Sequence, residues 1–276
     1  MRISVTHSTI YRYDAPVGPE PHTIRLRPRD DASQRLLRYG IEISPAPAGR
    51  SECLDQDGNV VLEAWFSEPV EQLAVSSSFE VETLRENPFA FLLTASAFPP
   101  QYEPPLARAL AGYLAMRRSA PVAECARAAA ARAGHRTLRF LAELNRTLHE
   151  EFRYEAREEG APHPPEATLD ARAGSCRDLA VLFCALCRSA GLAARFVSGY
   201  QSDGALHERA YMHAWSEVYL PGGGWRGYDP SQGLAVSTSH VAVAAAADPQ
   251  LAAPISGSYR GAARSTMQFQ IQMQVR

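Results

Sequence analysis

The pattern of the chain changes near residue 88, and this change limits the fold more than any other feature. Before it, apolar and polar residues alternate in short stretches such as Ile3-Ser4-Val5-Thr6, with prolines between the stretches. Such alternation predicts strands with one buried face. After it, 12 of the 28 residues from 106 to 133 are alanine, the residue that most favours helices. The sequence therefore predicts an α+β protein, with a β-sandwich-like domain over residues 1–100 and a second domain over residues 101–276.

The second domain combines helices with strands. Leucines at spacings of three and four predict one helix over residues 137–152, and a second, apolar helix over 176–190 ends before Gly191. Further segments have strand patterns, and these are residues 193–201, 212–220, 225–229 and 267–275. We group the last strand with the second domain. Residues 242–254 carry little signal, so we expect them at the surface.

The charges are balanced, with 28 basic and 30 acidic residues and a net charge of −2. Such a chain has no global field to attract nucleic acid or an anionic membrane. Its longest apolar run, Leu179–Cys187, is nine residues, whereas a bilayer span needs ~20. The N-terminus lacks the apolar stretch of a secretion signal. We therefore expect no nucleic-acid partner, no membrane partner and a cytoplasmic location.

All 28 basic residues are arginine, so no lysine amine of this chain can act as a base, a Schiff-base partner or an acyl acceptor. The five cysteines are an odd number in a chain without an export signal, which predicts free thiols rather than a disulfide scaffold. Cys184 and Cys187 have C-x-x-C spacing but lie within a predicted helix, which favours packing in the core over a metal or redox site.

Cys176 lies where a polar loop becomes a buried helix, in Gly174-Ser175-Cys176-Arg177-Asp178. The first N–H groups of a helix are unpaired and favour a thiolate over a thiol. The alternative is that Cys176 is a small buried apolar residue, which is the usual fate of a free cysteine.

A thiolate nucleophile works best beside a histidine that a third group orients. His213 is on a predicted strand whose alternate residues, Trp215 and Glu217, share its face. Asp229 follows sixteen residues later, beyond the loop Gly222-Gly223-Gly224. Two antiparallel strands joined by this loop can place Asp229 beside His213. The spacing permits this contact without requiring it, since a structural histidine and an Asp-Pro turn are common alternatives.

Several segments together closely resemble the transglutaminase-like superfamily in its bacterial form, over about residues 136–235. They are Gly174-Ser175-Cys176-Arg177-Asp178, Ala190-Gly191-Leu192, His213-Ala214-Trp215-Ser216-Glu217-Val218-Tyr219, and Gly224-Trp225 with Asp229-Pro230. The first domain is similar to the β-rich domain that precedes this core, in its segments His7–Tyr13, Leu26-Arg27-Pro28 and Asp57-Gly58-Asn59. The tail around His240-Val241-Ala242-Val243 and the final strand is similar too.

The resemblance implies a papain-like, transglutaminase-like core in which Cys176 is the nucleophile, His213 the general base and then acid, and Asp229 the orienting carboxylate. It implies acyl transfer through a thioester, without a cofactor, on a peptide or protein substrate with a glutaminyl or other amide bond. We expect hydrolysis, because nothing in the sequence reveals an amine site. The alternatives are transfer to an amine, as in a true transglutaminase, and a non-catalytic peptide-binding module.

Three further residues are candidates for the site. The Cys176 N–H is one donor for an oxyanion, and Tyr154 is our candidate for the second, although Tyr154 could equally pack in the core. Trp215 and Glu217 are candidate substrate contacts, and for Glu217 a solvated strand position is favoured. No metal site is predicted, and the weak alternative would combine His207, His213 and Asp203.

The sequence departs from relatives at the rim of the site. Met212 stands where relatives commonly carry Ser, and Ser231-Gln232-Gly233 replaces the usual Thr-Asn-Gly. Ala245-Ala246-Ala247-Asp248 replaces a Gly-Arg-Asp-Tyr run. These differences affect the expected substrate preference but not the three residues assigned to the reaction.

Overall fold

The computed structural model describes residues 1–95, 97–157, 159–202 and 212–276. Its strands are β1 (Arg2–Pro19), β2 (His22–Ile24), β3 (Gln34–Ser44), β4 (Gly49–Leu54), β5 (Val60–Trp65), β6 (Val70–Thr83), β7 (Arg153–Tyr154), β8 (Ala173–Gly174), β9 (Ala194–Gln201), β10 (Met212–Leu220), β11 (Gly224–Asp229), β12 (Leu234–Ala235), β13 (His240–Ala246), β14 (Ile255–Ser256), β15 (Tyr259–Arg260) and β16 (Ser265–Val275). Its helices are α1 (Pro104–Ala109), α2 (Ala111–Leu114), α3 (Ala120–Arg132), α4 (Thr137–Glu151), α5 (Pro165–Ala171), α6 (Cys176–Ser189) and the 3₁₀ helix η1 (Pro249–Ala252).

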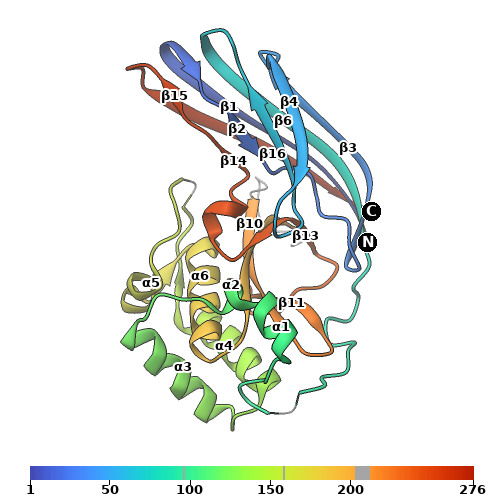
Figure 1. The fold of residues 1–276 in the computed structure, drawn as a ribbon, viewed down its shortest axis with the longest axis vertical. Coiled ribbons are helices and arrows are strands. Elements are labelled where there is room, and N and C mark those ends of the chain that lie inside the picture. Colours follow the sequence, from blue (N-terminus) through green and yellow to red (C-terminus); the bar gives the residue numbers. More distant parts are fainter. Residues whose placement is uncertain (96, 158, 203–211) are drawn as a thin grey trace.

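The β-rich region consists of two antiparallel sheets that face each other (Figure 1). One has the order β15-β1-β6-β3, with β16 also paired to β1, and the other has the order β14-β2-β5-β4. Residues of both sheets, including Ile24, Leu62 and Val75, form one buried cluster between them. Because alternate residues of each strand point into this cluster, the alternating pattern of the sequence produces the layered arrangement.

The C-terminal strand β16 pairs with β1 from Ile3↔Val275 to Tyr13↔Ser265. It therefore lies in the sheet of the β-rich region, although we had grouped it with the second domain. Strict alternation predicts a strand with one buried face but not which strand it will pair with. The boundary at residue 100 stays a prediction.

The core is a five-stranded antiparallel sheet with helices against it, which confirms the α+β class (Figure 1). The strand order is β12-β11-β10-β9-β13, and α6 packs on β9 and β10. Apolar residues of α6, including Leu182, Phe183 and Leu186, join those of α3 and α4 in the largest buried cluster. Ser216 Oγ of β10 donates to Ala180 O of α6 at 2.9 Å. The helix that begins at Cys176 is thus fixed on the sheet that carries His213 and Asp229.

Strand β13 corrects one expectation, because residues 240–246 are all buried although we expected residues 242–254 at the surface. Strand β13 is at the edge of the core sheet, and the β-rich region covers it. Two side-chain amides of the β-rich region form hydrogen bonds with the β13 backbone where a further strand would otherwise pair. Gln34 exchanges two hydrogen bonds with the Ala242 backbone, at 2.8 and 2.9 Å. Asn59 does the same with Ala245, at 2.9 Å for both bonds. A run of alanines has no alternation of apolar and polar residues, which is why its sequence does not reveal this buried strand.

The two parts of the molecule share a buried interface. Ile3, Val5 and Phe79 of the β-rich region pack against Tyr200 and Val241 of the core. Beside them, His7 Nδ1 lies 2.7 Å from the Tyr200 hydroxyl, and burial lowers the pKa of His7 to about 4. A neutral imidazole therefore takes part in this interface at neutral pH.

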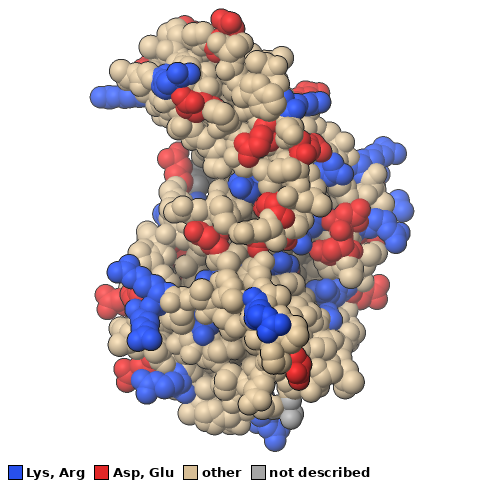
Figure 2. All heavy atoms as spheres, viewed as in Figure 1, with Lys and Arg blue, Asp and Glu red and all other residues tan. Residues whose placement is uncertain are grey.

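Charged residues on the face in Figure 2 are interspersed rather than gathered by sign, and the molecule is hollowed on one side between the β-rich region and the core. Among the helices of the described residues, none is long and apolar enough to cross a membrane.

Candidate active site

Cys176 is the first residue of α6, and its side chain is almost covered, with 8% of the residue exposed. Its backbone N–H is one of the unpaired donors at the start of the helix. Gly174 stands two residues before it, and a Cβ on Gly174 would lie 2.7 Å from Asp178 Cβ, closer than atoms can pack. The glycine thus allows the side chain of Asp178 to approach the backbone just before the thiol.

Asp178, on the first turn of α6, organises the backbone around Cys176. One carboxylate oxygen accepts from the N–H and hydroxyl of Ser175, at 2.8 and 2.7 Å. The other accepts from Arg157 Nη2 and from the His163 N–H, both at 2.7 Å. Burial alone would raise the pKa of Asp178, but these hydrogen bonds and the charge of Arg157 lower it. The carboxylate therefore fixes both the helix start and the loop in front of it.

His213 and Asp229 lie together on neighbouring strands β10 and β11, a contact that the sequence spacing permitted without requiring it. His213 Nε2 is 2.6 Å from Asp229 Oδ2. Because Nε2 is hydrogen-bonded to the Asp229 carboxylate, only Nδ1 of the His213 ring can exchange a proton with the Cys176 thiol. Asp229 and, to a smaller extent, the Cys176 thiol both raise the pKa of His213, so the imidazole interacts electrostatically with both groups.

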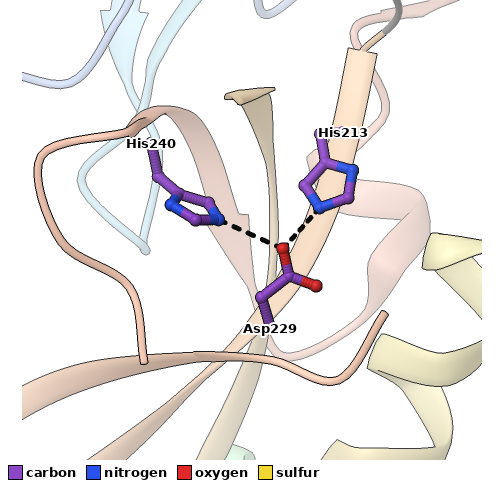
Figure 3. A group of neighbouring side chains, drawn as sticks. All are labelled: His213, Asp229 and His240. Atoms are coloured by element: carbon purple, nitrogen blue, oxygen red, sulfur yellow. Dashed lines mark hydrogen bonds and ion pairs between the residues drawn. The ribbon is translucent and has the colours of Figure 1, made fainter. Parts of the chain in front are cut away.

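Asp229 is 0% exposed and receives hydrogen bonds on both oxygens. Oδ1 accepts from the N–H and hydroxyl of Ser231, at 3.0 and 2.7 Å, and from the Gln232 N–H at 3.3 Å. Oδ2 accepts from His213 and also lies 3.1 Å from His240 Nε2 (Figure 3). His240 belongs to a segment that resembles the family, but no spacing argument assigned it to the site.

The electrostatics favour a thiolate beside an imidazolium. Burial raises the pKa of Cys176, but the hydrogen bond and charge of His213 outweigh this effect and lower it. Burial lowers the pKa of His213, yet Asp229 and Cys176 together raise it to about 10. Burial would raise the pKa of Asp229, but His213 and His240 hold it far below its usual value. Each of these shifts therefore favours the ionised form of its residue.

Tyr154 is brought to Cys176 by the short parallel pair of β7 and β8, in which Tyr154 stands opposite Gly174. Burial raises the pKa of Tyr154, and both the thiol and the backbone N–H of Cys176 act on it through hydrogen bonds. The phenol is therefore next to the helix-start N–H that could share an oxyanion with it. Half of Tyr154 is exposed, which sets it apart from a packed core tyrosine.

Trp215 and Glu217 are engaged within the protein. Trp215 is 1% exposed, packs with Val197, and lies with its ring centroid 6.3 Å from that of His213. Glu217 Oε2 lies 2.6 Å from Arg195 Nη2, and the guanidinium of Arg195 stands 4.2 Å from the ring centroid of Trp225. Trp215 is therefore a buried residue whose ring stacks beside that of His213, and Glu217 forms an ion pair with Arg195 of the neighbouring strand β9.

Two departures from the family pattern have structural consequences. Met212, directly before His213, packs against the cluster between the β-rich region and the core and against a second cluster within the β-rich region. Ser231 supplies two of the hydrogen bonds to Asp229 Oδ1. The β-rich region and the turn after Asp229 therefore help to fix His213 and Asp229.

Ligand atoms of His213, Asp229 and His240 lie within 4.8 Å of one another, a spacing at which such groups can also hold a metal ion. Both Nε2 atoms are at hydrogen-bond distance from one carboxylate oxygen, and a shared anion that accepts two N–H donors accounts for this arrangement. Of the residues in the weak metal alternative, His207 and Asp203 lie outside the described residues. The thiols of Cys184 and Cys187 are buried in the core, and burial raises the pKa of each.

Comparisons with known proteins show the family to which each part of the chain is similar. A family profile described as the bacterial transglutaminase-like N-terminal region matches residues 3–82, and one described as the transglutaminase-like superfamily matches residues 124–230. An uncharacterized protein of Mycobacterium tuberculosis is 28% identical over 272 residues, covering 93% of this chain and 87% of that protein. A protein-glutamine gamma-glutamyltransferase of Pseudomonas aeruginosa is 31% identical over 145 residues, covering 49% of this chain but 20% of that protein.

The fold has a counterpart among solved structures. A crystal structure from Cytophaga hutchinsonii, described provisionally as a cysteine protease, covers 100% of this chain and 91% of its own, with a TM-score of 0.71 at 20% identity. This similarity shows that the β-rich region and the core occur together in the same arrangement elsewhere. The chain thus consists of a bacterial transglutaminase-like N-terminal region, matched at residues 3–82, ahead of a transglutaminase-like superfamily core, matched at residues 124–230.

Proposed function

We propose that this protein is a cysteine enzyme that acts on amide bonds of peptides or proteins through a thioester, most simply as an amidase or peptidase. The observation that carries the proposal is the meeting of Cys176, His213 and Asp229, with a lowered thiol pKa and a raised imidazole pKa. A buried thiolate held by an adjacent imidazolium is the form in which cysteine attacks a carbonyl.

In the first half of the reaction, the Cys176 thiolate bonds to the amide carbon and the carbonyl electrons move to oxygen. The Cys176 N–H and the Tyr154 hydroxyl stabilise this oxyanion. The carbonyl then reforms, the carbon–nitrogen bond breaks, and the departing amine takes a proton from His213. Asp229 holds the imidazole in the orientation that makes this proton transfer direct.

In the second half, water attacks the thioester while His213 takes its proton. The carbon–sulfur bond breaks, which releases the acid and restores the thiolate and the imidazolium. An amine in place of water would give transfer instead of hydrolysis. This second candidate is favoured by the similarity over 145 residues to a protein named as a protein-glutamine gamma-glutamyltransferase.

A product analysis of glutamine-containing peptides tests the proposal and separates the two outcomes. Peptides are incubated with and without a primary amine, and mass spectrometry follows conversion of glutamine to glutamate, peptide cleavage and amine adducts. We expect turnover by the natural chain and by Cys53→Ala, whose cysteine is exposed and remote in sequence, and none by Cys176→Ala. Equal turnover by Cys176→Ala, or peptide binding by the natural chain without any product, would overturn the proposal.

A further inference from the structure

His240 is a buried histidine that the proposed reaction does not use. It is 4% exposed and begins strand β13. Its Nε2 lies 3.1 Å from Asp229 Oδ2 (Figure 3). Its Nδ1 lies 2.9 Å from the Ser239 hydroxyl. The ring therefore has a partner at each nitrogen, and one of those partners is the carboxylate that orients His213.

The partners fix the tautomer of His240. Burial lowers its pKa, so the ring is neutral and carries one N–H. The Asp229 carboxylate can only accept, whereas the Ser239 hydroxyl can donate. The proton of His240 therefore lies on Nε2 and points at Asp229, and Nδ1 accepts from Ser239.

This hydrogen bond matters for the geometry of the carboxylate. Asp229 Oδ1 is held by Ser231 and Gln232, but without His240 its Oδ2 would be held by His213 alone. His213 must itself exchange protons with the thiol and the substrate. A second, unreacting donor on Oδ2 keeps the carboxylate in place while the protonation of His213 changes.

Two further contacts hold His240 itself. The ring of Trp215 meets that of His240 edge to face, with centroids 5.1 Å apart. Strand β13 is bound along its outer edge by Gln34 and Asn59 of the β-rich region. The position of His240 therefore depends on a part of the chain that contributes no reacting group.

Resting on the proposed function, we infer that His240 is a positioning residue, which holds the Asp229 carboxylate toward His213 and is itself held by the β-rich region through β13. Hydrogen bonds to the groups that orient a reacting side chain affect activity through geometry, and at metal sites the loss of such outer contacts typically costs about 10–100-fold. The effect should appear in kcat, because His240 is covered and does not reach the substrate.

The test compares two variants of similar shape that differ in the ability to donate, His240→Gln and His240→Met. We expect His240→Met to lower kcat about 10–100-fold at little change in KM, and His240→Gln to recover most of this loss. His7→Gln is the matched control, because His7 is buried to a similar extent as His240 but binds Tyr200 and Thr9. Its kcat should stay unchanged, and urea unfolding shows whether each variant is folded.

The inference is overturned if folded His240→Met keeps the natural kcat, or if His240→Gln and His240→Met lose activity equally. If His240→Met does not fold, Ser239→Ala provides the same test, because it removes the hydroxyl that orients the His240 ring. An unchanged kcat in Ser239→Ala would then contradict the inference. Failure of the proposed function looks different, because the natural chain itself would show no turnover.

Discussion

His213 and Asp229 meet through a 2.6 Å hydrogen bond between Nε2 and Oδ2, at a carboxylate that has no exposure to water. A charged carboxylate in such a place needs compensation, which four further hydrogen bonds from Ser231, Gln232 and His240 supply. The carboxylate is thus rigid and ionised, and the imidazole that it orients is left with Nδ1 free for Cys176.

Replacing Asp229 by Asn should remove the charge that holds the proton on His213 while keeping the shape of the side chain. By analogy with serine hydrolase triads, we expect kcat/KM to fall by roughly 10²–10⁴. Steady-state kinetics on a glutamine-containing peptide measure the effect. Asp170→Asn, at an exposed position on α5, is the control and should leave the rate unchanged. Equal values of kcat/KM for Asp229→Asn and Asp170→Asn would contradict a role for Asp229 in the reaction.

Tyr154→Phe removes one hydroxyl next to the Cys176 N–H and leaves the ring in place. Loss of an oxyanion donor typically lowers kcat by about 10²–10³, and we expect a decrease in that range. Alkylation of Cys176 by iodoacetamide forms no oxyanion, so its rate should change little. A decrease in alkylation that matches the decrease in kcat would show that Tyr154 acts on the thiol and not on the oxyanion.

The side-chain amide of Asn59 is fully buried and forms hydrogen bonds with both the N–H and the carbonyl of Ala245, as a paired strand would do. In Asn59→Ala, the Ala245 N–H and carbonyl lose their partner, at a cost of about 1–3 kcal/mol for each unpaired group. Urea unfolding followed by circular dichroism measures the loss. Gln72→Ala, whose side chain is exposed and accepts from Arg12, should cost less than about 0.5 kcal/mol. Similar losses in both variants would contradict the role of Asn59.

The interface histidine His7 should make stability depend on pH. Its pKa is about 4 in the folded protein against an ordinary value of 6.5. The unfolded chain therefore binds a proton at His7 that the folded protein does not, and stability is lost as pH falls from 6.5 toward 4. The upper limit is about 3 kcal/mol. The urea midpoint of the natural chain should therefore fall more between pH 7 and pH 4 than the midpoint of His7→Gln. An equal fall in both proteins would contradict this assignment.

Local pattern was enough to predict the elements that carry the reacting residues. A loop that becomes an apolar helix predicted a helix over 176–190, and the structure has α6 over Cys176–Ser189. Alternation and a glycine loop predicted the strands of His213 and Asp229. The sequence offered Tyr154 only as a candidate oxyanion donor, with a core position as the alternative. Its position beside Cys176 depends on a two-residue strand, which is too short to show a period.

Long-range relations were not predictable in the same way. The partner of His240 lies eleven positions away across a turn, and no periodicity distinguishes this histidine from a surface one. Strand β13 consists largely of alanine and valine and is buried by a region far earlier in the chain. Likewise, the alternation of β16 fixes which of its faces is buried but not that β1 is its partner.

The most direct test of the central claim is the rate of Cys176 alkylation as a function of pH, followed by mass spectrometry of each cysteine. If Cys176 and His213 form an ion pair, Cys176 reacts well below the ordinary thiol pKa of 9.0 and faster than exposed Cys53, and His213→Ala abolishes this advantage. If Cys176 instead reacts no faster than Cys53 and gains reactivity only near pH 9.0, the thiol is an ordinary one and the account is wrong.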